Sequence, residues 1–166
     1  MNTSLAFDFS VDKENKVITV QREFAAELPL VWDAYTKSDL LDRWWAPKPW
    51  KAKTKTMDFR EGGRWHYSMV GPDGEEHWSL VQYRSIQPQK QFTGRDAFAD
   101  ADGNVNTDMP RSDWQVTFTD KGEKTLVESR ITFDDLSQLE NLLQMGFQDG
   151  LTTAMNGLDE LLASQK

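Results

Sequence analysis

The sequence predicts an α+β fold in which one antiparallel sheet packs against a long C-terminal helix. Between residues 51 and 133, segments that alternate apolar and polar side chains are separated by short turn sequences, as in antiparallel strands joined by hairpins. Residues 136–161 instead repeat apolar side chains at helical spacing, which is typical of an amphipathic helix. A sheet with one apolar face needs a cover, and this helix is the only large candidate.

The N-terminal part of the chain is expected to begin loosely. Residues 1–15 are predicted to form a loose segment, whereas KVITVQREF at 16–24 alternates apolar side chains and predicts the first strand. A chain of 166 residues fits one domain. We therefore expect a single domain over residues 16–166.

Two short helices are expected after this first strand. Pro29 suits the first turn of a helix, and LVWDAYT behind it places apolar side chains at helical spacing. Ser38 can cap a second short helix. Pro47 and Pro49 must end that helix, because proline cannot continue one.

About six strands follow, and the first of them carries two local signals. Lys51, Lys53 and Lys55 alternate with small residues, which is typical of a solvated or edge strand. The alternation shifts near Met57, which predicts a β-bulge.

The C-terminal helix has two features of its own. Ser137 with Glu140 matches a capping box at the helix start. Gly146, Gly150 and Ala154 recur every four positions and form a stripe of small side chains. Because glycine inside a helix costs about 1 kcal/mol relative to alanine, the stripe needs a reason. Close approach of the sheet and cavity volume are the two candidates.

The order of these elements resembles a known family. WWAP at 44–47, GGRWHYSM at 62–69, YRSIQP at 83–88 and MGFQDGLTTAMNGLDELL at 145–162 carry the resemblance. In order and spacing they are similar to the activator of heat-shock-protein-90 ATPase homologue family, within the START-like, Bet v 1-like (SRPBCC) superfamily. The resemblance covers nearly the whole chain, from residue 16 to 164.

This resemblance implies a helix-grip fold, in which a curved antiparallel sheet wraps around the C-terminal helix and encloses an apolar cavity. Members of the superfamily bind lipids, sterols, polyketides or other hydrophobic small molecules, and some are cyclases or dehydratases. The implied function is binding of a hydrophobic small molecule, lipid-like or aromatic. A chaperone-regulator-like interaction module is a further alternative. The eukaryotic activator, however, has a separate N-terminal domain for which we expect no room here.

Aromatic and other apolar side chains of the sheet and helix are candidates for the cavity wall. Trp65, Tyr67 and Met69 share one face of their strand by alternation. Such side chains suit an adaptable apolar site, although the same rings can also simply fill the core. The candidate ligand-binding residues are Trp44, Trp45, Phe59, Trp65, Tyr67, Met69, Trp78, Phe92, Phe98, Trp114, Phe118, Phe147, Gly150, Leu151 and Ala154.

Trp44 and Trp45 raise a separate question, because adjacent residues cannot share a face of a helix or strand. One reading is a lid, with one ring inside the cavity and the other over its rim. The alternative is a hydrophobic plug without a role in binding.

Asp96 is the one charged candidate. It has the strand parity of Phe92 and Phe98, and a charged group inside needs a partner or a shifted pKa. An ion pair with Arg22 or Arg95 is the structural explanation. The functional explanation is an Asp96 that orients a ligand or acts as a base, which underlies the alternative of a cyclase- or dehydratase-type enzyme. No other catalytic residue is predicted, and enzymatic activity is left open.

Composition and motifs argue against several other classes. With 19 basic and 27 acidic side chains, the net charge is −8, which disfavours general nucleic-acid binding. The chain has no cysteine and two histidines without metal-ligand spacing, so neither a metal nor a cofactor is predicted. His66 alternates out of the aromatic face and is expected to be exposed. Without a signal-peptide pattern or an apolar run of about 18 residues, we expect no membrane span and a cytoplasmic location. A homodimer is possible.

Overall fold

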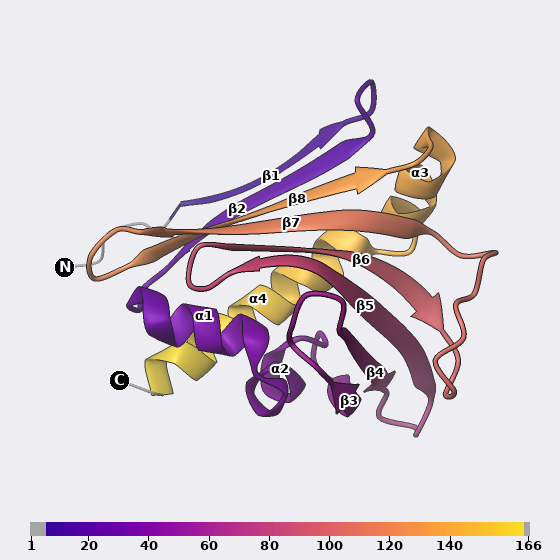
Figure 1. Cartoon of the computed structure of the whole chain (residues 1–166), viewed down its shortest axis with the longest axis horizontal. Helices are drawn as coiled ribbons and strands as arrows, with labels where there is room; N and C mark the ends of the chain where they lie inside the picture. Colours follow the sequence, from indigo (N-terminus) through magenta and orange to yellow (C-terminus); the bar gives the residue numbers. More distant parts are fainter. Residues whose placement is uncertain (1–5, 165–166) are drawn as a thin grey trace.

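The computed structural model describes residues 6–164, and its centre is a curved, eight-stranded antiparallel sheet (Figure 1). The strand order is β1-β2-β8-β7-β6-β5-β4-β3, so every neighbouring pair except β2 and β8 is consecutive in the chain. The strands are β1 (Phe7–Asp12), β2 (Val17–Phe24), β3 (Lys51–Met57), β4 (Arg64–Val70), β5 (Glu76–Gln87), β6 (Gln91–Ala99), β7 (Arg111–Asp120) and β8 (Thr125–Phe133).

Helices cover one face of this sheet. They are α1 (Leu28–Thr36), α2 (Ser38–Trp44), α3 (Leu136–Gln144) and α4 (Phe147–Ser164). α4 crosses beneath the curved sheet, and α1 and α2 pack against it (Figure 1). The predicted helix-grip fold is thereby confirmed. Within residues 6–164, no helix combines the length and the apolar character that a membrane crossing requires.

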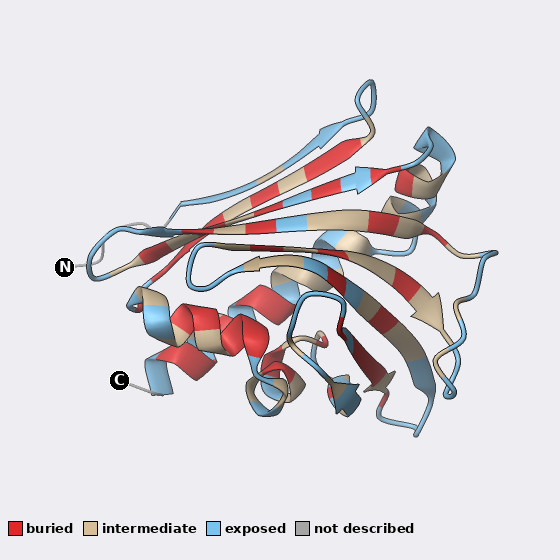
Figure 2. Ribbon diagram, viewed as in Figure 1, coloured by how far each residue is buried: buried red, intermediate tan, exposed pale blue. Residues whose placement is uncertain are grey.

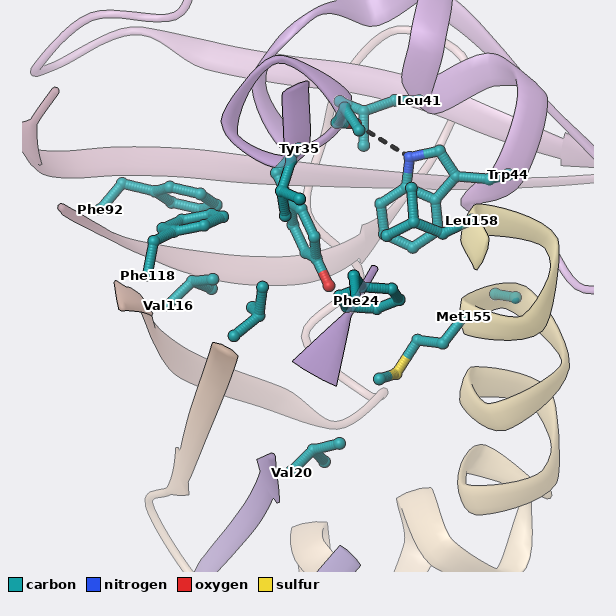
Figure 3. Packing of buried hydrophobic residues seen from close by; sticks show 14 of the residues in the cluster. Val20, Phe24, Tyr35, Leu41, Trp44, Phe92, Val116, Phe118, Met155 and Leu158 are labelled. Atoms are coloured by element: carbon teal, nitrogen blue, oxygen red, sulfur yellow. Dashed lines mark hydrogen bonds between the residues drawn. The ribbon is translucent and has the colours of Figure 1, made fainter. Parts of the chain in front are cut away.

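The core lies between the helices and the inner face of the sheet. Burial alternates along β8, where Val127, Ile131 and Phe133 are buried on this face (Figure 2). Phe24 of β2 and Leu158 of α4 are both fully buried in this core, one from the sheet and the other from the helical layer (Figure 3). Burial of apolar area on one face of each element is what fixes the sheet register, since a slip of one residue would expose the whole set.

The N-terminal segment differs from the prediction. Residues Phe7–Asp12 form the edge strand β1, which pairs with β2 from Phe7↔Arg22 to Asp12↔Val17. This part of the segment that we expected to be loose is therefore a strand, whereas residues 1–5 lie outside the described residues. Phe7 and Val11 stay exposed, whereas Phe9 is half-buried and packs against Phe147 of α4. The alternation of these three apolar residues is a strand signal that the prediction overlooked.

The predicted single C-terminal helix is two helices. α3 ends at Gln144, α4 begins at Phe147, and Gly146 between them has φ +86°. This left-handed conformation is one that glycine adopts without strain and that commonly ends a helix. The apolar period continues through the break, which is why the pattern alone suggests one helix.

Both predicted helix caps are wrong. Asp135, not Ser137, caps α3, and its carboxylate accepts a hydrogen bond from the Gln138 backbone N–H at 3.0 Å. Ser38 is the first residue of α2, and Lys37 before it provides no side-chain cap. By contrast, the predicted bulge in β3 is confirmed, because the register with β4 shifts between residues 54 and 56.

Candidate functional site

A cavity of about 240 Å³ lies between the inner face of the sheet and the beginning of α4. Strands β4, β5, β6 and β7 form its sheet wall, and the α3–α4 junction forms its helical wall. The lining residues are Trp45, Pro47, Tyr67, Met69, His77, Ser79, Asp96, Ala97, Phe98, Pro110, Ser112, Trp114, Phe133, Leu142, Met145, Gly146, Phe147, Gly150 and Leu151.

Asp96 and Ser112 form a hydrogen-bonded polar pair in this wall, which also contains His77 and Ser79. They lie directly opposite each other on β6 and β7, so both side chains point to the same face. Asp96 Oδ1 accepts hydrogen bonds from the Ser112 backbone N–H at 2.9 Å and from the Ser112 hydroxyl at 2.6 Å. The Trp114 indole N–H donates to Ser112 Oγ at 3.1 Å. The carboxylate is thus held in one orientation, and Oδ2 is the oxygen left for a further donor.

Burial raises the pKa of Asp96 from 3.8 to about 6, because a carboxylate inside the protein loses much of its hydration. The two hydrogen bonds from Ser112, the nearby Trp114 indole N–H and the charge of Arg111 act in the opposite direction. Asp96 nevertheless retains partial exposure, and this accessible surface faces the cavity. A perturbed carboxyl group in a cavity is a functional-site candidate.

Trp45 and Tyr67 stand between the main cavity and a smaller inner compartment. The Trp45 indole N–H donates to the Tyr67 hydroxyl at 2.9 Å, and both residues line both spaces. Burial raises the pKa of the Tyr67 hydroxyl, which therefore stays protonated. The inner compartment has a volume of about 50 Å³ and is also lined by Tyr35, Leu41, Trp65, Val81, Tyr83, Phe92, Asp96, Trp114 and Val116.

The two adjacent tryptophans have different roles. Trp44 is 2% exposed, donates from its indole N–H to the Ala34 carbonyl at 2.8 Å and packs against Tyr35 (Figure 3). Trp44 therefore belongs to the core and lines neither compartment. Trp45 follows the end of α2 and lies in the cavity wall, 5.7 Å from the Trp65 ring and 6.0 Å from the Trp114 ring.

The remaining predicted ligand-binding residues fall into three groups. The first lines the main cavity and comprises Met69, Phe98, Phe147, Gly150 and Leu151, together with Tyr67 and Trp114. The second lines only the inner compartment and comprises Trp65 and Phe92. The third lines neither and comprises Phe59, Trp78, Phe118 and Ala154, besides Trp44.

Residues of the third group lie away from both cavities for identifiable reasons. Phe59 and Phe118 pack against Trp32 of α1, with ring centroids 5.9 and 5.0 Å away, and so complete the core. Ala154 is buried in α4, beyond the end of the cavity. Trp78 points to the outer face of β5, where its ring lies 4.9 Å from that of His66.

His66 is buried, contrary to the expectation from alternation. Its side chain does point away from the aromatic face, but it is only 2% exposed. Its Nε2 lies 2.9 Å from the Asp100 carbonyl oxygen, so the loop after β6 covers it. Within residues 6–164, no group of three or more His, Asp or Glu side chains is placed to hold a metal ion.

The predicted ion pairs of Asp96 are wrong. Arg22 instead lies 3.8 Å from Asp159 of α4. Arg95 points to the outer face of the sheet, where it pairs with Asp113 and Asp134 at 3.1 and 2.7 Å. Successive residues of a strand point to opposite faces, which separates Arg95 from its neighbour Asp96. Asp96 therefore has Ser112 as its partner and no basic side chain in contact.

Among the residues that line the cavity, sequence reasoning missed Ser79, Ser112 and Met145. Ser112 lies two residues before Trp114, so alternation places it on the same face and could have identified it. Ser79 has the parity of Tyr83 in the same way. Met145 could not be predicted as a lining residue, because a single continuous helix was expected where the chain turns at Gly146.

Comparison with known proteins assigns the chain to a family. A family model described as "Activator of Hsp90 ATPase homolog 1-like protein" matches residues 25–163. The chain belongs to this family. The match confirms the resemblance seen in the sequence, and it spans α1 through α4 together with every strand that lines the cavity.

Solved structures of similar proteins share the fold over almost their whole length. Protein Ms6760 from Mycobacterium smegmatis is 33% identical, with a TM-score of 0.87, and the match covers 96% of this chain and 97% of that one. A protein from Arthrobacter aurescens is 27% identical, with a TM-score of 0.89 and coverage of 95% and 91%. One from Staphylococcus epidermidis is 26% identical, with a TM-score of 0.82 and 95% of each chain covered. None of the curated proteins compared with the chain matches it.

Proposed function

We propose that the chain binds a hydrophobic small molecule, lipid-like or aromatic, in the cavity between the sheet and α4. The composition of the cavity wall carries this proposal, because aromatic and aliphatic side chains surround one oriented carboxylate. Apolar surface of this kind favours transfer of an apolar ligand from water. A small number of polar groups inside an apolar pocket fixes the orientation of the ligand. The superfamily resemblance supports the same function.

The helical side of the cavity offers a sharp test. A Cβ atom built on Gly150 meets only Pro47 Cγ, at 3.8 Å, so a leucine there projects into the cavity without a clash at its base. Gly157 lies in the same helix, has nothing within 4 Å of such a Cβ and does not line the cavity. Gly157→Leu is therefore the matched control.

The assay is the fluorescence of the neutral apolar probe N-phenyl-1-naphthylamine, which brightens when it leaves water. We expect the wild-type chain and Gly157→Leu to bind the probe and Gly150→Leu to lose it while remaining folded. If Gly150→Leu binds as the wild type does, or if the wild type binds nothing, the cavity is not a binding site.

A second candidate function is general acid–base catalysis by Asp96 in a cyclase- or dehydratase-type reaction. The observation that favours it is the pKa of Asp96, which burial raises to about 6, because an efficient acid or base has a pKa near the working pH. Incubation of a host metabolite extract with the wild type and with Asp96→Asn, followed by mass spectrometry, separates the two functions. An enzyme consumes a compound that Asp96→Asn leaves intact, whereas a binder retains a compound unchanged.

Interaction with a chaperone and formation of a homodimer stay predictions. The description of the family model names an activator of the Hsp90 ATPase. A surface that docks on a chaperone would need a contiguous apolar patch. The exposed large apolar side chains among the described residues are divided between β1 and the α3 region: Phe7, Val11, Leu136 and Met145. We therefore expect the purified chain and an Hsp90 protein to elute separately from a size-exclusion column.

A further inference from the structure

The wall of the main cavity carries one carboxylate, Asp96, and one histidine, His77. Of the described residues that line the main cavity and the inner compartment, Asp96 is the only carboxylate, and neither a lysine nor an arginine occurs. Arg111 is near enough to influence Asp96. Its guanidinium, however, donates to Gln82 Oε1 at 2.7 Å and lies outside the lining. An ionised Asp96 therefore has no lysine or arginine counter-ion within the cavity, and no ion pair with His77 is formed.

The hydrogen bonds around Asp96 leave one oxygen unassigned. Both donors of Ser112 go to Oδ1, so they orient the carboxylate without neutralising its charge. Oδ2 can accept a further, charge-assisted hydrogen bond, which is stronger than a bond between neutral groups. The rings of Trp45, Tyr67 and Trp114 line the same space, and aromatic faces attract cations.

We propose that the ligand is an organic amine, with a protonated ammonium group on the Asp96 carboxylate and an apolar body against Trp114, Phe147 and Leu151. This inference rests on the proposed function and specifies the chemical class of its ligand. An ammonium ion supplies the missing counter-ion, donates to Oδ2 and lies beside aromatic rings. A carboxylate ligand, such as a fatty acid, would instead bring a second negative charge to Asp96.

The size of the cavity limits the apolar body. A cavity of about 150 Å³ lined by apolar side chains holds a benzene molecule. The 240 Å³ present here therefore accommodate a body of about two fused rings on the same scale. Naphthalene derivatives are suitable probes, because one ring system can carry an ammonium, a hydroxyl or a carboxylate group at the same position.

The experiment compares three such probes by isothermal titration calorimetry at about pH 7.5: 1-naphthylmethylamine, 1-naphthalenemethanol and 1-naphthoate. We expect the amine to bind at least about tenfold more tightly than the alcohol, as one charge-assisted hydrogen bond can provide, and the carboxylate to bind most weakly. Asp96→Asn keeps the shape of the side chain and should reduce the advantage of the amine to less than about twofold. Asp102→Asn removes an equal charge in the exposed loop after β6 and should leave the advantage unchanged.

The outcomes separate the inference from the function on which it rests. If the three probes bind equally, or the alcohol or carboxylate binds best, the amine inference is wrong and the apolar cavity stands. If none of them binds, the proposed function fails as well. If Asp96→Asn retains the amine preference, another group recognises the ammonium and the inference is equally overturned.

A measurement on the wild type guards against a variant that does not fold. Lowering the pH to about 5 protonates Asp96, so the advantage of the amine over the alcohol should shrink severalfold. The other ionisable groups near Asp96 are Tyr35 on α1, Tyr67 on β4, His77 and Tyr83 on β5 and Arg111 on β7, while the lining residues of α3 and α4 carry none. His77→Gln should keep the same pH dependence, and an advantage that is constant from pH 7.5 to 5 contradicts the inference.

Discussion

Replacement of Asp96 by asparagine should stabilise the protein at about pH 8. In the folded chain, burial raises the pKa of this carboxyl group from 3.8 to about 6, which means that the ionised form is less stable there than in the unfolded chain. At about 1.36 kcal/mol for each pH unit, the difference between these two pKa values corresponds to at most about 3 kcal/mol. Asp96 retains partial exposure, so solvent screens part of the charge and we expect a gain of about 1–3 kcal/mol.

The pH dependence follows from proton binding. Between about pH 4 and 6 the folded chain binds more protons at Asp96 than the unfolded chain, so the free energy of unfolding contributed by this group falls as the pH rises. The penalty is complete above the folded-state pKa and absent below about pH 4. Asparagine accepts the same two Ser112 hydrogen bonds through its Oδ1 and carries no charge, so the variant lacks this dependence.

Urea unfolding followed by tryptophan fluorescence at about pH 4.5, 6 and 8 measures the effect. Asp96→Asn should be more stable than the wild type at pH 8, by an amount that shrinks towards pH 4.5, with an unchanged dependence on urea concentration. Asp102→Asn serves as the control for loss of one surface charge. The reasoning is refuted if Asp96→Asn is less stable than the wild type at pH 8, or if the difference is the same at all three pH values.

Three further pairs of substitutions test the site and the helix ends. Trp45→Ala should weaken binding of N-phenyl-1-naphthylamine while the chain still folds. Trp44→Ala should instead lower the free energy of unfolding by about 3–5 kcal/mol, as loss of a buried aromatic side chain does. Equal effects of the two substitutions in urea unfolding would contradict the assignment of Trp44 to the core. Gly146→Ala should destabilise because φ is +86°, while Gly157→Ala should stabilise by up to about 1 kcal/mol, as thermal unfolding can show. Asp135→Ala should cost about 1 kcal/mol as loss of a helix cap, and a larger loss for Ser137→Ala would restore the capping-box interpretation.

Most of the fold is predictable from this sequence because the spacing of apolar residues indicates which face of each helix or strand is buried. The alternation in β8 and the helical period in α4 each require one covered face, and together they specify a sheet packed on a helix. The two errors have different causes. At Gly146 the local backbone conformation turns the chain although the apolar period continues. β1 is an edge strand with little burial, and the short alternation of its apolar residues was overlooked.

The site is less predictable because alternation gives the face of a residue but not its depth along the strand. Phe118 and Trp114 share one face of β7, yet Phe118 fills the core beside Trp32 and Trp114 lines the cavity. Which of them meets empty space depends on the side chains that arrive from α1 and α4. Asp96 was identified by its parity, but its partner Ser112 required the register between β6 and β7.

The stability cost at Asp96 and the proposed amine ligand are two consequences of one uncompensated charge. A protein that only needed to fill this position could use asparagine, which makes the same hydrogen bonds to Ser112 without a buried charge. A carboxylate is useful there when something positive binds to it, because the ammonium group of a ligand offsets the free-energy penalty of burying this charge. By linkage, the ligand must then lower the pKa of Asp96. The two experiments therefore test the same premise. If Asp96→Asn does not stabilise the protein at about pH 8, the charge of Asp96 is already balanced within the folded chain, and the structure gives no reason for an amine to bind there.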